Sequence, residues 1–323
     1  MFCRNRNIIG VLSVFLLCTA CETDPVIYID SQAIPVIYGI FDKQDSIHYL
    51  KVGKSFGALH DPMESSQVYD SLFFRDMEVE VRMTSRGKPV GYPLELEKVN
   101  GLPKDAGIFH FPGQELYRFY GYLSEGIEVK VQVPGLPIAW AEVTLVSMAA
   151  LSTPKRAQQY IYLVPTSPLR IHWYGNAWNE IDVAFEFIED MGDSIFRSKW
   201  VHIQNINYFD SPHDKYREMK ITYDEFIPEV LNQIPPDEAV KAVFLGYITI
   251  TIHGGDLNMV NYKKYLNGYT DFNVNEFSNI ENGIGLVASR TTFSLDSLRF
   301  DYETRQTLIN ENRLKVLKIS KWN

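Results

Sequence analysis

Residues 127–133 read Ile-Glu-Val-Lys-Val-Gln-Val, and this alternation of apolar and polar side chains decides the fold class. Successive side chains of a β-strand point to opposite faces, so a period of two predicts a strand with one buried face and one solvated face. Residues 79–83 repeat the pattern, and residues 181–187 and 244–253 carry it into the second half of the chain. The sequence therefore predicts a mainly β protein.

The strand-like stretches are short, and residues typical of turns separate them. Strands at this spacing favour a sandwich over parallel βαβ units. The stretch Ala149–Gln158 lacks periodicity and marks a boundary. We predict two β-sandwich-like domains of the immunoglobulin or fibronectin III type, residues 34–150 and residues 158–323.

The second predicted domain includes a few short helices. Tyr223–Ile234 has helical character and stops at a Pro-Pro pair, and Asp256 is placed to cap a helix that runs to Tyr265. Residues 301–309 are a further helix candidate, and Leu314–Ile319 is a candidate for the last strand.

The first twenty residues resemble a secretory signal peptide. Two arginines precede an apolar run, Ile8–Leu17, and a run of this length is too short to span a bilayer, which takes about twenty residues. Leu17-Cys18-Thr19-Ala20-Cys21 resembles a bacterial lipobox, although Cys18 stands where leucine is usual. We expect cleavage of residues 1–20, a lipid on Cys21 and a tether over residues 21–33. An ordinary signal peptide or an uncleaved anchor is the alternative.

Cysteine content and net charge limit the disulfides and the kinds of partner that the mature chain can have. Of three cysteines only Cys21 outlasts cleavage, which excludes a disulfide in the body. Removing residues 1–20 removes two arginines and no acid, which takes the formal net charge from −9 to −11. Nucleic acids and anionic lipid surfaces bind proteins rich in basic residues. We therefore predict no nucleic-acid partner, and we predict that the chain contacts the membrane only through the lipid on Cys21.

The stretch Glu276–Leu286 reads Glu-Phe-Ser-Asn-Ile-Glu-Asn-Gly-Ile-Gly-Leu. It resembles an element before the closing strand of an uncharacterised Bacteroidetes lipoprotein family, catalogued as a domain of unknown function. Val79-Glu80-Val81, Gly107-Ile108-Phe109 and Trp140-Ala141-Glu142 resemble that family's first half. Val287-Ala288 stands where the family usually has an aromatic residue and a glycine.

The resemblance implies a lipoprotein of the cell envelope, on the outer membrane and displayed at the surface. Acidic residues after the lipid cysteine, here Glu22 and Asp24, resemble signals for that display. Many lipoproteins of this kind stand beside TonB-dependent transporters. The resemblance supplies no catalytic residue.

Three neighbouring aromatic residues are the candidate ligand platform: Trp173, Tyr174 and Trp178. Aromatic faces stack on sugar rings, so an exposed group of this kind would bind a glycan. The alternative, which large aromatics favour, is that Trp173 belongs to the core and Trp178 to its edge.

Four serines follow an aspartate and precede an aliphatic residue: Ser46, Ser71, Ser194 and Ser297. The pattern is similar to an O-glycosylation sequon of Bacteroidetes. The alternative is a turn that enters a strand, where Asp and Ser are common.

No motif points to catalysis. The chain lacks the two-histidine zinc-protease pattern, a Gly-x-Ser-x-Gly nucleophile elbow and a glycine-rich phosphate loop. We expect no metal, no cofactor and no enzymatic activity. The predicted function is a non-enzymatic binding or accessory lipoprotein, beside a TonB-dependent nutrient transporter. A glycan-binding module is the alternative, and a glycoside hydrolase-like enzyme with scattered carboxylates is the second alternative.

Overall fold

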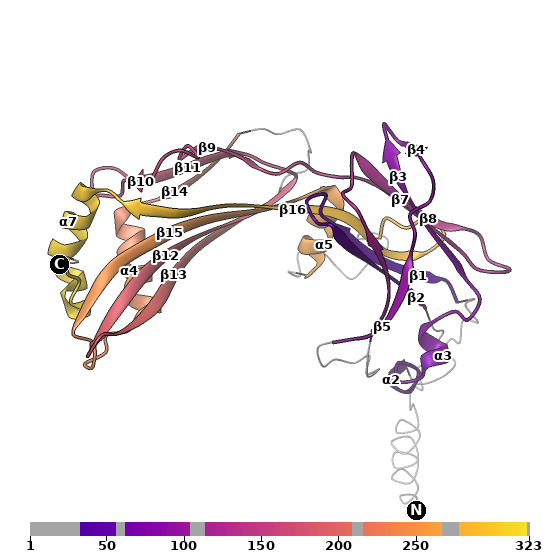
Figure 1. Ribbon diagram of the computed structural model, residues 1–323, viewed down its shortest axis with the longest axis horizontal. Helices are drawn as coiled ribbons and strands as arrows, with labels where there is room; N and C mark the ends of the chain where they lie inside the picture. The colour runs from indigo at the N-terminus through magenta and orange to yellow at the C-terminus, as the bar shows by residue number, and fades with distance from the viewer. Residues whose placement is uncertain (1–32, 56–61, 104–113, 209–215, 267–277, 322–323) are drawn as a thin grey trace, which may run out of the picture.

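The computed structural model describes residues 33–55, 62–103, 114–208, 216–266 and 278–321 (Figure 1). The strands are β1 (Pro35–Phe41), β2 (Ile47–Lys54), β3 (Glu78–Ser85), β4 (Lys88–Val90), β5 (Glu97–Leu102), β6 (Gln114–Tyr120), β7 (Gly126–Gln132), β8 (Ala139–Thr144), β9 (Ala150–Thr153), β10 (Tyr160–Ile161), β11 (Leu169–Tyr174), β12 (Trp178–Gly192), β13 (Ile195–Tyr208), β14 (Arg217–Ile221), β15 (Ala242–Gly255) and β16 (Ile284–Phe300). The helices are α2 (Pro62–Ser65), α3 (Tyr69–Leu72), α4 (Tyr223–Gln233), α5 (Leu257–Leu266), α7 (Tyr302–Asn310) and a 3₁₀ helix, η1 (Asn312–Leu317). The prediction of a mainly β protein is confirmed.

One hydrophobic core lies in the first half of the chain. Strands β1, β2, β6 and β5 are neighbours in one sheet, and β4, β3, β7 and β8 form a four-stranded sheet. The apolar side chains of each alternating strand point into this core. Four of them are fully buried: Ile37, Val81, Phe119 and Val129. The period of two in the sequence is thus the cause of the buried layer.

A second core fills the other half. Strands β13, β12, β15 and β16 are consecutive neighbours in the large sheet. Apolar residues on its inner face, including Val183, Phe185 and Ile250, pack with β11, β14 and helices α4 and α7. Phe185 stacks on Phe300 at 5.6 Å and meets Phe226 edge-on at 4.8 Å. The other face of this sheet carries the polar phase of the same strands.

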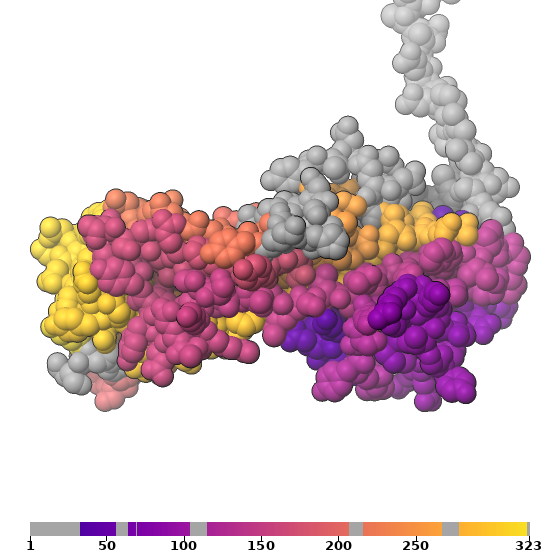
Figure 2. Space-filling view, turned by 90° about the horizontal axis from the view of Figure 1, so that it is seen from above, coloured from indigo at the N-terminus to yellow at the C-terminus, as the bar shows by residue number. Residues whose placement is uncertain are grey.

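Strand β16 belongs to both halves of the molecule. Its first residues pair in parallel with β1, from Val36 opposite Ile284 to Phe41 opposite Ser289. From Arg290 onward it pairs antiparallel with β15. The colours of the C-terminal segment therefore appear at one end of the molecule and again on the N-terminal half (Figures 1 and 2).

Side chains of the segment before β16 hold it in place. They make hydrogen bonds to the β16 backbone of the kind that a neighbouring strand would make. The Asn279 side chain accepts from the backbone N–H of Val287 at 2.9 Å and donates to its carbonyl at 2.7 Å. The Ser278 hydroxyl accepts from the N–H of Gly285 at 3.1 Å. Asn282 and Gly285 take positive φ angles of 56° and 127°. These residue types therefore have a structural reason in this motif.

Several sequence predictions can now be scored. The helices at residues 223–234 and 301–309 are confirmed by α4 and α7. The strand at Leu314–Ile319 is wrong, because η1 winds as a 3₁₀ helix and only Ile319 bridges to β15. The break at Ala149–Gln158 contains β9, which pairs with β11.

Other predictions stay untested. The signal peptide, Cys21 and the tether up to residue 32 lie outside the described residues, as does Gly107-Ile108-Phe109. The division into residues 34–150 and 158–323 stays a prediction, and β16 runs across it.

Asp256 directly precedes α5, and its backbone N–H donates to the Ser289 carbonyl at 3.1 Å. Its side chain accepts from the N–H of Met259 at 3.0 Å, which confirms the predicted cap. Burial raises the pKa of Asp256 to about 6, although hydrogen bonds from backbone N–H groups of Met259 and Ser289 lower it. A carboxyl with a raised pKa in the folded state binds its proton more tightly there than in the unfolded chain.

The stability of the chain should therefore fall as the pH rises from about 4 to about 6, by up to about 3 kcal/mol from Asp256 alone. Asp256→Asn keeps an oxygen that caps α5 and removes the titration. We expect urea unfolding between pH 5 and pH 7.5 to give a smaller loss of stability for this variant than for the wild type. Parallel profiles would contradict the assignment, since the two proteins differ only at residue 256.

Candidate functional site

The predicted aromatic platform does not exist as a group. Trp173 is 0% exposed and Trp178 is 5% exposed, whereas Tyr174 is 54% exposed. Trp173 shares the inward phase of β11 with Ile171, and its indole N–H donates to Asn179 Oδ1 at 3.4 Å. Trp178 packs with α5. The hypothesis of an exposed tryptophan pair is wrong, and the alternative that these rings belong to the core holds.

The four candidate glycosylation serines occupy different local structures. Ser46 lies in the turn before β2, and Ser194 lies at the tip of the β12–β13 hairpin with φ 62°. Ser297 lies at a bulge of β16 with φ 65°. These three are exposed, whereas Ser71 in α3 is half-buried. Modification of these serines stays a prediction.

A different set of aromatic residues comes together on the outer face of the sheet in the second half. Trp200 of β13 is opposite Glu186 of β12. Glu186 faces a bulge of β15, where its carboxylate accepts from the N–H of Tyr247. Tyr247 contacts Arg299 of β16, and Arg299 is opposite Tyr160 of β10. We call these five residues the aromatic row.

The row crosses five neighbouring strands and alternates aromatic with charged side chains. Trp200, Tyr247 and Tyr160 are 40%, 43% and 49% exposed. Neighbouring strands lie about 4.8 Å apart, so aromatic residues two strands apart are spaced by about 10 Å. The row therefore places three exposed rings on alternate strands of one sheet face.

Two charged residues hold the central ring in place. Arg299 donates to the Tyr247 hydroxyl at 2.7 Å, and its guanidinium carbon lies 4.7 Å from the ring centroid. Glu186 accepts from the Tyr247 N–H at 3.1 Å and from the Ser198 hydroxyl at 2.7 Å. A ring positioned in this way loses little entropy when a ligand stacks on it.

Two hollows meet at Tyr247 and Arg299. The first, of about 430 Å³, is lined by residues that include Arg156, Tyr160, Asp296 and Ser297. The second, of about 390 Å³, is lined by residues that include Ile188, Phe300 and Arg305. Since Tyr247 and Arg299 line both, the central part of the row has concave space on two sides.

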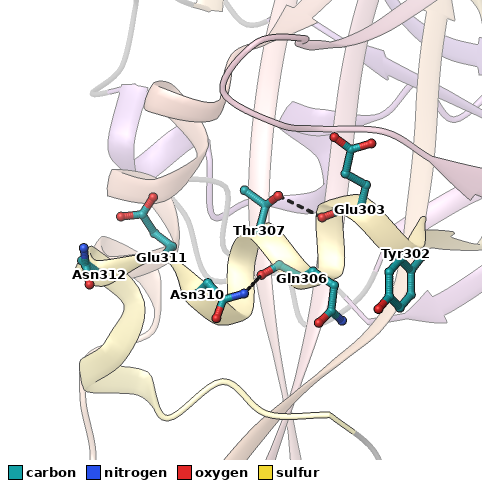
Figure 3. A pocket seen from close by; sticks show the side chains of 7 residues that line it. All are labelled: Tyr302, Glu303, Gln306, Thr307, Asn310, Glu311 and Asn312. Carbon is teal, nitrogen blue, oxygen red and sulfur yellow. Dashed lines mark hydrogen bonds between the residues drawn. The ribbon is translucent and has the colours of Figure 1, made fainter.

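A third hollow follows one side of α7 and the turn into η1 (Figure 3). Two of its side chains bond back to their own helix: Thr307 donates to the Glu303 carbonyl at 2.9 Å, and Asn310 donates to the Gln306 carbonyl at 2.8 Å. Glu311 accepts from Arg313, which lowers its pKa to about 2. These contacts stabilise the C-terminal end of the helix.

Histidine–carboxylate pairs occur on the same sheet. His202 Nδ1 lies 2.8 Å from Asp182 Oδ2 on the outer face. In the described part of the chain, no three His, Cys, Asp or Glu residues are grouped to hold a metal ion. Nor is any helix there long and apolar enough to cross a membrane.

Sequence reasoning missed the aromatic row, although a signal was present. In both β13 and β15 the alternation puts a large aromatic in the polar phase: Trp200 next to buried Val201, and Tyr247 next to buried Ile248. A tryptophan or tyrosine in that phase predicts an exposed ring on a solvated face.

Comparison with known proteins adds little. No family model matches the chain, and no curated protein matches it. The structure is similar to a DUF4785 family protein of Legionella pneumophila, with 12% identity, a TM-score of 0.20, and coverage of 66% of this chain and 51% of that chain. It is also similar to the C-terminal globular domain of an oligosaccharyltransferase from Pyrococcus abyssi, with 8% identity, a TM-score of 0.17, and coverage of 81% and 45%.

The chain thus spans about half the length of each of these structures. Membership of a Bacteroidetes lipoprotein family stays a prediction.

Proposed function

We propose that this chain is a non-enzymatic binding protein of the cell envelope, held to the outer membrane by a lipid on Cys21, and that its ligand is an extended glycan. The observation that carries the proposal is the aromatic row. Three exposed rings on alternate strands of one sheet face match a linear ligand with repeated apolar ring faces. The row supplies exposed ring faces together with charged side chains, which is what a binding surface requires.

Glycan rings are flat, with C–H groups on each face and hydroxyls around the edge. Aromatic faces pack against the C–H groups, and the charged residues between them reach the hydroxyls. In the row, Glu186 lies between Trp200 and Tyr247, and Arg299 lies between Tyr247 and Tyr160. The same surface therefore provides both kinds of contact along one line.

We also propose that each core lies between two sheets as in an immunoglobulin-like or fibronectin III-like sandwich. The alternation of strands β3, β7 and β12 supports this arrangement. A place beside a TonB-dependent transporter remains a prediction from the family resemblance.

Tyr247→Ala is expected to weaken glycan binding about tenfold or more, because it removes the central ring of the row. The measurement is affinity electrophoresis of the full-length chain in detergent, in gels that each contain one neutral or one acidic polysaccharide. Tyr174→Ala is the matched control, since Tyr174 is also an exposed tyrosine but lies on β11. Equal retardation of both variants would contradict the proposal, as would a wild type that no polysaccharide retards.

A further inference from the structure

Three arginines surround the centre of the aromatic row. Arg299 lines both hollows, Arg156 lines the first and Arg305 lines the second. They come from β16, from the segment before β10 and from α7. Residues far apart in the sequence thus bring guanidinium groups to one place, on a chain whose formal net charge is −9.

These three arginines form no ion pair with an acidic residue of the described chain. Arg156 lies over the Phe293 ring at 5.6 Å, Arg299 donates to the Tyr247 hydroxyl, and Arg305 donates to the Asp301 carbonyl at 3.3 Å. Elsewhere arginines meet carboxylates: Arg118 pairs with Glu97 at 2.8 Å, and Arg313 with Asp224 at 3.1 Å. A guanidinium has five N–H donors, so those around the row retain unused donors.

The carboxylates near the row already have other donors. Glu186 accepts from a hydroxyl and a backbone N–H. Asp296 accepts from the Ser294 hydroxyl at 2.9 Å, and Asp301 caps α7 by accepting from the N–H of Thr304 at 2.9 Å. The three guanidinium groups therefore outnumber the one carboxylate, Asp296, among the residues that line the two hollows.

We infer that the two hollows bind acidic substituents of the glycan, so that the ligand class is a carboxylate- or sulfate-bearing polysaccharide. This inference rests on the proposed function, because the aromatic row would hold the sugar rings. Arginine binds planar or tetrahedral oxyanions through two parallel N–H donors, with more geometric specificity than a lysine. Tyr247 would stack on a ring while Arg299 contacts its acidic group from the neighbouring strand.

The experiment is titration calorimetry of the full-length chain in detergent with three probes: oligogalacturonides, their methyl esters, and sulfated galactan oligosaccharides. The esters keep the sugar ring and remove the charge. We expect the acidic probes to bind about tenfold tighter than the esters. Added salt should weaken binding of the acidic probes and leave the esters unaffected.

Arg299→Gln should weaken the affinity for the acidic probes about tenfold and leave the affinity for the esters unchanged. Arg290→Gln is the matched control, because Arg290 is exposed on the same strand, away from the row. It should bind all probes as the wild type does.

The outcomes separate the two proposals. Equal affinity for acids and esters would overturn the inference and leave the glycan-binding function in place. Acidic binding that survives Tyr247→Ala but not Arg299→Gln would support the arginine site and overturn the role of the aromatic row. No binding to any probe would overturn the inference for both kinds of acid.

Discussion

Replacing Gly285 with alanine is expected to lower the free energy of unfolding by about 4 kcal/mol. A Cβ on this residue would lie 2.0 Å from the Ile37 carbonyl oxygen and 2.8 Å from its carbonyl carbon. Both obstacles are backbone atoms of β1, so no side-chain rotation relieves the overlap. The φ angle of 127° adds strain for any residue with a side chain.

The matched control is Gly91→Ala. Gly91 also has a positive φ, 71°, but a Cβ there has no atom within 4 Å. Its substitution should cost only the conformational term, about 1 kcal/mol. Urea unfolding of the full-length variants gives both values. If the two substitutions lower the free energy of unfolding by the same amount, then β1 shifts without an energetic penalty. The close packing of β1 against β16 would then not contribute to stability.

Trp173→Ala and Trp200→Ala are expected to have opposite consequences. Trp173 is fully buried among apolar residues, so its truncation leaves a large cavity and should lower the free energy of unfolding by about 3–5 kcal/mol. Trp200 is 40% exposed at one end of the aromatic row. Its truncation should cost about 1 kcal/mol or less in stability and weaken glycan binding.

Thermal unfolding and affinity electrophoresis of both variants test this pair. For Trp173→Ala, binding is measured below the unfolding transition, where the remaining folded protein should bind its glycan as the wild type does. Suppose that folded Trp173→Ala loses glycan binding and Trp200→Ala retains it. The binding site would then lie at β11, and the proposal that the aromatic row binds the glycan would be contradicted.

The sequence predicted the parts of the fold whose cause is local. The alternation of residues 127–133 places Val129 and Val131 in the core, and Asp256 caps α5 as its position indicated. Strand pairing has no local cause. Nothing in residues 35–41 indicates a parallel partner at residues 284–289, because register depends on contacts made across the whole chain.

The candidate site escaped prediction for the same reason. Its five residues lie on five strands, and bulges at residues 246–247 and 296–297 shift the register that brings them into line. Trp173 and Trp178 looked more promising because they are close in sequence, yet the phase of β11 and the packing of α5 bury them. Proximity along the chain was the wrong guide to a surface built across strands.

The pairing of β1 with β16 imposes an order on how the molecule is completed. A chain made or translocated from its N-terminus presents residues 35–41 early, but their parallel neighbour, residues 284–289, emerges late. The first core includes Val287 and Ile280, so it stays open until nearly the whole polypeptide has appeared. Such high contact order slows folding and leaves one edge of β1 available to foreign strands during that interval. A chain interrupted before residue 278 would therefore lack part of its N-terminal core. The quality control of the cell would recognise such an incomplete chain by its unfinished N-terminal half.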